Sequence, residues 1–207
     1  NGVTGSENYF GSTLRYCCAT PLAGGTGNMT NAPQLASISH LSAGSPCIGA
    51  GSYALTSGVD LDGEAWLDPP CIGCDQYVAG MVTGGLLVAI NVGVADLVTD
   101  QPVELKAEIE GRVNGSVWTL DDGSVVSNMP LLRRSWALAG DYAVTLTAYS
   151  DTYESGVSTT VVMKVSERPT YYVNVSSANP AYPFTSWATA ATKIQDAVNA
   201  CVVPGPN

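Results

Sequence analysis

The chain has 207 residues, enough for one or two domains with substantial cores, and its formal net charge at pH 7 is −10. Only 13% of the residues are charged, whereas 22 are Gly and 12 are Pro, a composition typical of turn-rich β structure rather than of a disordered chain. The acidic balance argues against binding to nucleic acid, whose phosphates require clustered Lys and Arg, and against docking on an anionic membrane.

Residues 1–79 show short β-prone runs separated by turns rich in Gly, Pro and Ser, a pattern typical of solenoid coils. Within them, the sequences SPCIGAG at residues 45–51, DLDGEAW at residues 60–66 and IGCDQY at residues 72–77 follow one another. In order and spacing, these motifs resemble the C-terminal end of right-handed parallel β-helix proteins of the pectin-lyase-like type. The chain departs from that pattern at two positions, where Gly and Trp replace the usual Asp and Arg. The resemblance implies a β-helix C-terminal segment at residues 1–79.

Six cysteines are present, and five of them precede residue 76, in a stretch where Lys and Arg are nearly absent. This clustering favours disulfide bonds in an exported protein, with buried thiols as the alternative. A zinc site is disfavoured, because the pair Cys71 and Cys74 has no second well-spaced partner pair. Cys201 is left over and is a candidate for pairing between molecules. The candidates for a disulfide within the first segment are Cys17, Cys18, Cys47, Cys71 and Cys74.

An apolar stretch at residues 77–95 approaches the length of a membrane span. Four glycines interrupt it and no basic flank follows, so we do not expect it to cross a membrane. We predict instead a linker at residues 80–85 and a first strand at residues 86–92.

Residues 86–166 contain the alternation of apolar and polar side chains that is typical of half-buried strands. The clearest example is residues 142–149, where Tyr142, Val144 and Leu146 fall on one face. We expect this face to be buried. About seven such strands in about eighty residues predict an immunoglobulin-like β-sandwich.

A hairpin turn is predicted at residues 121–123, which have the sequence Asp-Asp-Gly and lie between β-prone runs at residues 117–120 and 124–126. Gly tolerates a positive φ angle there, and an Asp side chain accepts hydrogen bonds from its own backbone. The two runs are therefore expected to pair as antiparallel strands.

The hairpin and the final alternating strand together resemble the PKD domain, an immunoglobulin-like β-sandwich. Leu120 replaces the usual Phe of the family and Asp121 stands where the family has Gly. The resemblance implies a fold but little about chemistry, since this domain mostly serves as a spacer or adhesive module. The residues that carry the resemblance are Trp118, Asp122, Gly123, Ser124, Trp136, Gly140, Tyr142, Val144 and Leu146.

Residues 167–207 differ in character from the sandwich. A strand is predicted at residues 171–175, and apolar residues at helical spacing predict a helix at residues 191–201, with Ser186 or Thr189 as its cap. These sequences resemble the N-terminal cap of the same β-helix class, in which a strand and a short helix close the solenoid. The expected fold is thus mainly β: a PKD-like sandwich joined to two parallel β-helix end segments, with one short helix near the C-terminus.

The sequence offers no catalytic constellation, and we expect no enzyme activity and no cofactor. His40 is the only histidine and lies in a polar loop without a nucleophile motif, so a packing or surface role is expected. Alternate carboxylates at Asp60, Asp62 and Glu64 are weak candidates for a Ca²⁺ site, because their spacing does not fit the full calcium-binding loop.

Tryptophans are the candidate contacts for a glycan. Strand alternation places Trp118 in the predicted core together with Leu120. Trp66 and Trp136 are the two that we consider for stacking on a sugar.

Three functions fit these patterns. The leading hypothesis is a non-catalytic extracellular structural or adhesive module of a bacterial surface protein, in which β-helices and PKD sandwiches alternate as repeats. Because a solenoid end exposes unpaired edges, residues 170–207 of one copy are expected to dock on residues 1–79 of the next and propagate a filament, unless neighbouring repeats of a longer chain fill the gap. The alternatives are a fragment of a carbohydrate-active β-helix enzyme with a PKD spacer, and a carbohydrate-binding module.

Overall fold

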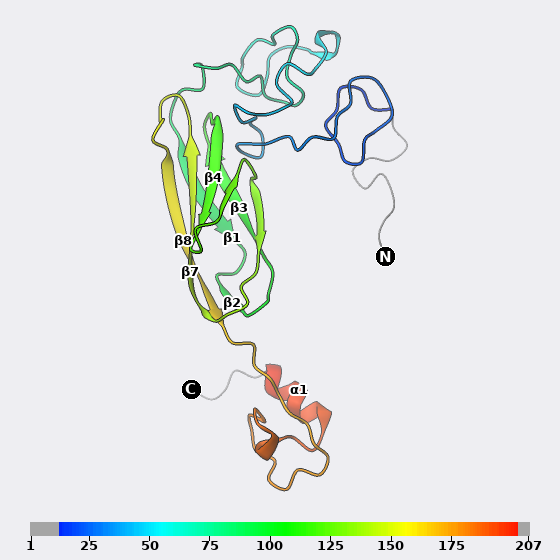
Figure 1. The fold of residues 1–207 in the computed structure, drawn as a ribbon, viewed down its shortest axis with the longest axis vertical. Helices are drawn as coiled ribbons and strands as arrows, with labels where there is room; N and C mark the ends of the chain where they lie inside the picture. Colours follow the sequence, from blue (N-terminus) through cyan, green and yellow to red (C-terminus); the bar gives the residue numbers. More distant parts are fainter. Residues whose placement is uncertain (1–12, 203–207) are drawn as a thin grey trace. The chain divides into compact units, whose positions relative to one another are not determined.

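The computed structural model describes residues 13–202 and divides into two compact units, one up to Val165 and one from Ser166 (Figure 1). The chain is mainly β, with one short α-helix near its C-terminus, as the sequence predicted. The strands are β1 (Leu87–Val92), β2 (Asp96–Val98), β3 (Val103–Glu110), β4 (Gly115–Leu120), β5 (Val125–Ser127), β6 (Leu131–Arg134), β7 (Gly140–Tyr149) and β8 (Val157–Ser166). The helices are the short 3₁₀ turns η1 (Tyr53–Leu55) and η2 (Trp187–Thr189) and the α-helix α1 (Ile194–Val202).

The eight strands form a β-sandwich. One sheet has the order β1-β3-β6 and the other the order β2-β8-β7-β4-β5. Alternate residues of β7 are buried, as the sequence pattern predicted, and they meet apolar residues of the opposite sheet. The buried residues of this core are Leu97, Val103, Leu105, Ala107, Trp118, Leu120, Leu132, Trp136, Val144, Leu146, Met163 and Val165.

The predicted hairpin is present between β4 and β5, which pair in antiparallel register. Gly123 has a φ angle of 78°, the conformation for which Gly is favoured. The Asp122 carboxylate accepts a hydrogen bond from the Ser124 backbone N–H at 2.9 Å and pairs with Arg134 at 2.7 Å. Hydrogen bonding from Ser124 lowers the pKa of Asp122, so this turn keeps its charge at neutral pH.

Residues 13–86 contain no strand, although three isolated β-bridges join neighbouring turns. Cys18 bridges Met29 in a parallel sense, and two antiparallel bridges lie further along this segment. Its apolar residues form a small cluster of their own around Leu41, Cys47 and Cys71. The segment is therefore held by short turns and side-chain packing, and its relation to a β-helix stays a prediction.

The second unit is built from η2, α1 and the loops around them. Where a strand was predicted at residues 171–175, the structure has only an isolated parallel bridge between Val173 and Ala191. Ser186 caps η2 rather than the α-helix, because its side-chain oxygen accepts a hydrogen bond from the Thr189 N–H at 3.3 Å. Among residues 13–202, no helix is long and apolar enough to cross a membrane.

Helix α1 begins three residues later than the predicted start at residue 191. Its buried face consists of small residues, Ala197 and Ala200, whereas Ile194 is 73% exposed and Val198 47% exposed. The apolar spacing predicted a helix correctly; of the residues at that spacing, Ala197 is buried, whereas Ile194 and Cys201 are exposed.

Candidate functional site

The best-developed polar site lies where residues 33–82 meet two loops of the sandwich, a region that we call the junction. The Ala43 N–H donates to the Asn114 carbonyl at 2.8 Å in the β3–β4 loop. In the β7–β8 loop, Asp151 exchanges two hydrogen bonds of 2.8 Å with the backbone of Val82, and its second carboxylate oxygen accepts from the Asn114 side chain at 3.0 Å. The Asp151 carboxylate thus links residues 33–82 to both the β3–β4 loop and the β7–β8 loop.

Apolar packing reinforces the junction. Ala36 is fully buried and packs in one cluster with Leu86, Val113 and Ala148, of which the last lies on β7. The N-terminal segment therefore shares a small core with the sandwich, and backbone hydrogen bonds surround that core.

Arg112 supplies the positive charge of the junction. Its Nη1 lies 2.7 Å from Glu64 Oε1, and its Nε lies 3.3 Å from Asp62 Oδ2. The same guanidinium donates to the carbonyl oxygens of Asp62 and Met81, both at 3.3 Å. Residues 16–105 contain no Lys or Arg, so no basic residue lies near the acidic turn at residues 60–64 in the sequence. The fold brings Arg112 to this turn as its counter-charge.

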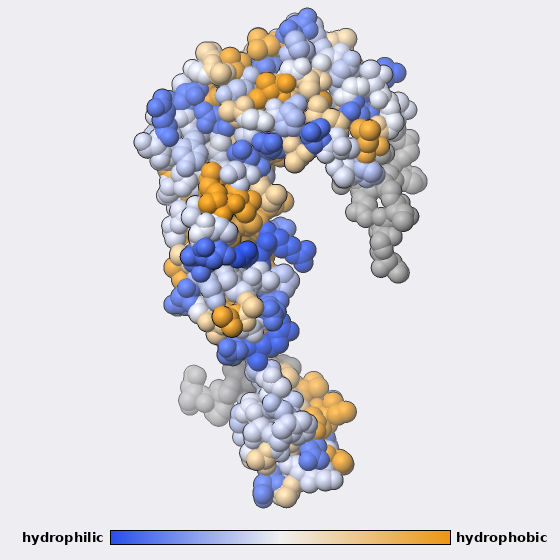
Figure 2. All heavy atoms as spheres, viewed as in Figure 1, coloured by the Kyte–Doolittle hydropathy of each residue, from blue (hydrophilic) through white to orange (hydrophobic). Residues whose placement is uncertain are grey.

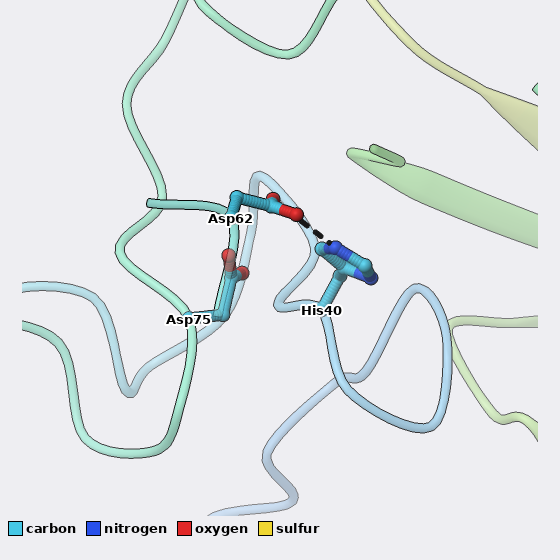
Figure 3. Close-up of side chains that lie close together, drawn as sticks. All are labelled: His40, Asp62 and Asp75. Atoms are coloured by element: carbon cyan, nitrogen blue, oxygen red, sulfur yellow. Dashed lines mark hydrogen bonds and ion pairs between the residues drawn. The ribbon is translucent and has the colours of Figure 1, made fainter. Parts of the chain in front are cut away.

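His40 lies beside this ion pair and is only 7% exposed (Figure 3). Its Nε2 lies 3.2 Å from Asp62 Oδ2, and its Nδ1 lies 2.9 Å from Ser37 Oγ. Asp75 is also buried, and its Oδ2 accepts a hydrogen bond of 2.7 Å from the Leu41 N–H. One donor atom from each of His40, Asp62 and Asp75 lies within 4.8 Å of the other two.

Burial is the largest influence on the pKa values of the Asp75 and Glu64 carboxyl groups in this cluster. Burial raises the pKa of Asp75, against the opposing effects of the Leu41 N–H and of His40. Burial also raises the pKa of Glu64 in spite of its pairing with Arg112, and neighbouring carboxylates add to both shifts. The Asp75 and Glu64 carboxyl groups are thus easier to protonate than exposed ones.

The three carboxylates considered for Ca²⁺ do not converge on one point. Asp60 Oδ1 accepts from the N–H groups of Asp62 at 3.0 Å and Glu64 at 2.7 Å, while its Oδ2 accepts from the Gln76 N–H at 2.9 Å. Asp60 therefore shapes the turn, Glu64 pairs with Arg112, and only Asp62 faces His40 and Asp75.

Sequence reasoning missed His40, Asp75 and Arg112 as parts of one site. His40 was expected to pack or to lie on the surface; it is buried, and its ring nitrogens contact Ser37 and Asp62, which the sequence did not indicate. The available signal was the run of acidic residues at 60–75 without a local base, which requires a cation from elsewhere in the chain.

The tryptophans have separate roles. Trp118 is fully buried, and its Nε1 donates to the Met129 carbonyl at 2.8 Å. Trp136 is 5% exposed and stacks on Tyr142 with ring centroids 5.3 Å apart, which corrects the expectation that it offers a face to a glycan. Trp66 is half-buried and lines an open cavity of about 260 Å³ whose wall also includes Arg15.

All six cysteines are free thiols in this structure, in contrast to the bridge expected among the first five. Cys47 and Cys71 are buried in the cluster around Leu41, against which Cys18 packs. A buried thiol behaves as a small apolar side chain, so packing accounts for these positions without a bond. Burial and the neighbouring Cys18 raise the pKa of Cys47 to about 11.

We expect this burial to separate the cysteines by reactivity under reducing conditions. At about pH 8, a thiol with such a pKa is ionised only to roughly one part in a thousand, and the thiolate is the nucleophile. Iodoacetamide should therefore label the exposed Cys74 and Cys201 at least about tenfold faster than Cys47. Peptide mass spectrometry measures the rates, and labelling in urea is the control. Equal rates for Cys47 and Cys74 in the folded protein would contradict the described packing.

No protein-family model and no curated protein matches the sequence. Among solved structures, the PKD1 domain of Vibrio anguillarum Epp is 19% identical and covers 41% of this chain and 98% of that domain, with a TM-score of 0.34. The PKD domain of the human receptor SorCS2 is 16% identical over 46% of this chain and 92% of that domain, with a TM-score of 0.33.

A structure described as showing the promiscuous specificity of carbohydrate-binding modules from the β-sandwich superfamily is 19% identical. The match covers 48% of this chain and 38% of that one, with a TM-score of 0.36. These structural neighbours include PKD domains and a carbohydrate-binding β-sandwich module.

Proposed function

We propose that this chain is a non-catalytic structural module of an extracellular bacterial surface protein. Its sandwich acts as a spacer, and the junction fastens the preceding segment to the sandwich so that the two bear load together. The β-helix relationship of the two end segments belongs to this proposal and rests on their sequence motifs.

The observation that carries the proposal is the way Asp151 and Arg112 tie residues 33–82 to both loops at one end of the sandwich. A flexible linker between independent domains makes few contacts with either of them. Here the connection is a shared apolar cluster surrounded by hydrogen bonds and ion pairs. Such a connection transmits force and orientation from one part of the chain to the next.

We expect Asp151→Ala to loosen the junction without unfolding the sandwich. The change removes acceptors for the Val82 N–H and the Asn114 side chain, and an unpaired buried donor costs about 1–3 kcal/mol. Limited proteolysis should then cut within residues 33–82 several-fold faster than in the wild type, and the sandwich should persist as a stable fragment. Asp141→Ala is the control, because it removes an exposed carboxylate of β7.

Two results would count against the proposal. Unchanged cleavage of the Asp151→Ala protein would show that the junction does not hold the segment. Hydrolysis or elimination of a polysaccharide by the wild-type protein at enzyme-like rates would support instead a fragment of a carbohydrate-active enzyme.

Self-assembly is the second part of the proposal. The C-terminal unit exposes large apolar side chains, among them Val175 at 83%, Trp187 at 66% and Ile194 of α1 at 73%. Figure 2 shows hydrophobic residues on the surface of this unit. Head-to-tail docking on residues 1–79 of the next copy, or on a neighbouring repeat, would cover them. Deleting residues 167–207 should abolish association in analytical ultracentrifugation and any fibres in electron micrographs. A wild-type protein that stays a monodisperse monomer at high concentration would contradict the proposal of self-assembly.

Carbohydrate binding is the alternative, and the cavity beside Trp66 favours it. Tyr16 and Arg15 line the same cavity, so an aromatic face and a guanidinium donor lie together. A glycan array should then give signals that Trp66→Ala removes, and an array blank for both proteins would dismiss the alternative.

A further inference from the structure

The inner part of the junction has the chemistry of a metal site. His40 contributes an imidazole nitrogen, and Asp62 and Asp75 contribute carboxylate oxygens; these donor atoms lie within 4.8 Å of one another. Figure 3 shows the three side chains converging from two loops. An imidazole with two carboxylates is a donor set for divalent cations such as Mn²⁺ and Zn²⁺.

The surroundings of His40 suit a ligating histidine. A metal-bound imidazole usually donates its other N–H to a nearby oxygen, which fixes the orientation of the ring. Two hydroxyl oxygens are within reach of Nδ1, Ser37 Oγ at 2.9 Å and Ser39 Oγ at 3.3 Å. When Nδ1 carries the ring proton and donates it to one of these hydroxyl oxygens, Nε2 presents its lone pair on the side of Asp62.

The charge of the cluster calls for a further cation. Arg112 pairs with Asp62 and Glu64, while the described partners of Asp60 are backbone N–H groups. Asp75, which is 5% exposed, has the Leu41 N–H as its hydrogen-bond donor and no guanidinium pair among the described residues. A dication placed between His40, Asp62 and Asp75 would balance the Asp75 carboxylate, which Arg112 does not reach, and would share Asp62 with the guanidinium.

The space for such an ion is small and defined. A cavity of about 10 Å³ is lined by His40, Asp62, Glu64, Asp75 and Arg112, among other residues. This volume is close to that occupied by one water-sized particle. A cavity of this size, with polar walls, is suited to a single ion rather than to an organic ligand.

We propose that His40, Asp62 and Asp75 bind one divalent transition-metal cation, which cross-links the loop at residue 40 to the loop at residues 60–75. The bound ion stiffens the N-terminal side of the junction from within. This inference is independent of the spacer role, because a module fastened only by Asp151 and Arg112 serves as a spacer without any metal.

Mn²⁺ is the probe of choice, because it prefers oxygen and nitrogen donors and the six cysteines therefore compete poorly for it. His40 is the only histidine, so its Cε1 proton gives a uniquely assignable NMR signal. In the full chain after treatment with EDTA and dialysis, a few hundredths of an equivalent of MnCl₂ should broaden this signal selectively. Titration followed by the electron paramagnetic resonance of free Mn²⁺ should give one site per chain.

Two variants test the ligands. His40→Gln and Asp75→Asn should each weaken Mn²⁺ binding at least about tenfold and abolish the rise in Tm that Mn²⁺ gives the wild type. Asp122→Asn is the control, because it removes an acidic side chain of the distant hairpin turn and should bind Mn²⁺ like the wild type.

The wild-type NMR measurement decides the matter even where a variant fails to fold. A His40 signal that stays sharp up to millimolar Mn²⁺ would overturn the proposal. Folded variants that bind Mn²⁺ as tightly as the wild type would overturn it as well, because the ion would then be held elsewhere. Failure of either kind leaves the proteolysis of the Asp151→Ala protein unaffected.

Discussion

Replacing Trp118 by alanine is expected to lower the free energy of unfolding by about 3–5 kcal/mol. The indole is fully buried between the sheets, so its removal leaves a large cavity among side chains such as Leu105 and Leu146. The change also leaves the Met129 carbonyl without the indole N–H that binds it at 2.8 Å. Both effects act in the same direction, and together they make this the most costly single substitution that we predict.

Denaturation in urea, followed by circular dichroism, measures this loss. Val125→Ala is the matched control, because Val125 lies on the neighbouring strand β5 but is 58% exposed and should change the stability by less than about 0.5 kcal/mol. Asp122→Ala should have a small effect limited to the hairpin turn. Equal losses for the Trp118 and Val125 variants would contradict the register of β4.

The second large effect is expected for Arg112→Met. The substitution keeps much of the side-chain volume but removes the only guanidinium that pairs with Asp62 and Glu64, whose side chains are 20% and 18% exposed. Removing one partner of a buried ion pair leaves an uncompensated charge. Since this pair is partly hydrated, we expect a cost of about 2–4 kcal/mol.

Two further variants make the measurement specific. Arg112→Lys should restore only part of the stability, because one ammonium group cannot reach both carboxylates and the Met81 carbonyl as the planar guanidinium does. Arg133→Met removes the same charge from an exposed position of β6 and should change little. A loss of less than about 0.5 kcal/mol for Arg112→Met would show that the acidic turn does not depend on it.

Local patterns were sufficient to predict the sandwich elements. The alternation in β7 reports which side chains face a core, and it depends only on the period of an extended backbone. The turn at residues 121–123 was predictable for the same reason, because the φ angle of Gly123 and the Asp122–Ser124 hydrogen bond involve neighbouring residues. Both features needed no knowledge of distant contacts.

Helix α1 and Trp136 show where local patterns stop being informative. The spacing of apolar residues indicated a helix at residues 191–201, but the structure buries Ala197 and Ala200 and exposes Ile194. Trp136 was compatible with a surface or a core position until its stacking on Tyr142 was known. Which face of an element is buried depends on the shape of what packs against it.

The amino-acid sequence by itself thus determined the class of fold, the hairpin and the acidic character of the turn at residues 60–64. Only the tertiary structure decided which residues the acidic side chains of this turn contact. Arg112 lies 48 residues from Glu64 along the chain, and His40 lies 22 residues from Asp62. Pairing over such separations is set by how two loops of the sandwich receive the N-terminal segment, and no local pattern encodes it. The excess of acidic residues in the sequence shows that the turn at residues 60–64 needs a positively charged partner, but the packing of the fold determines that this partner is Arg112.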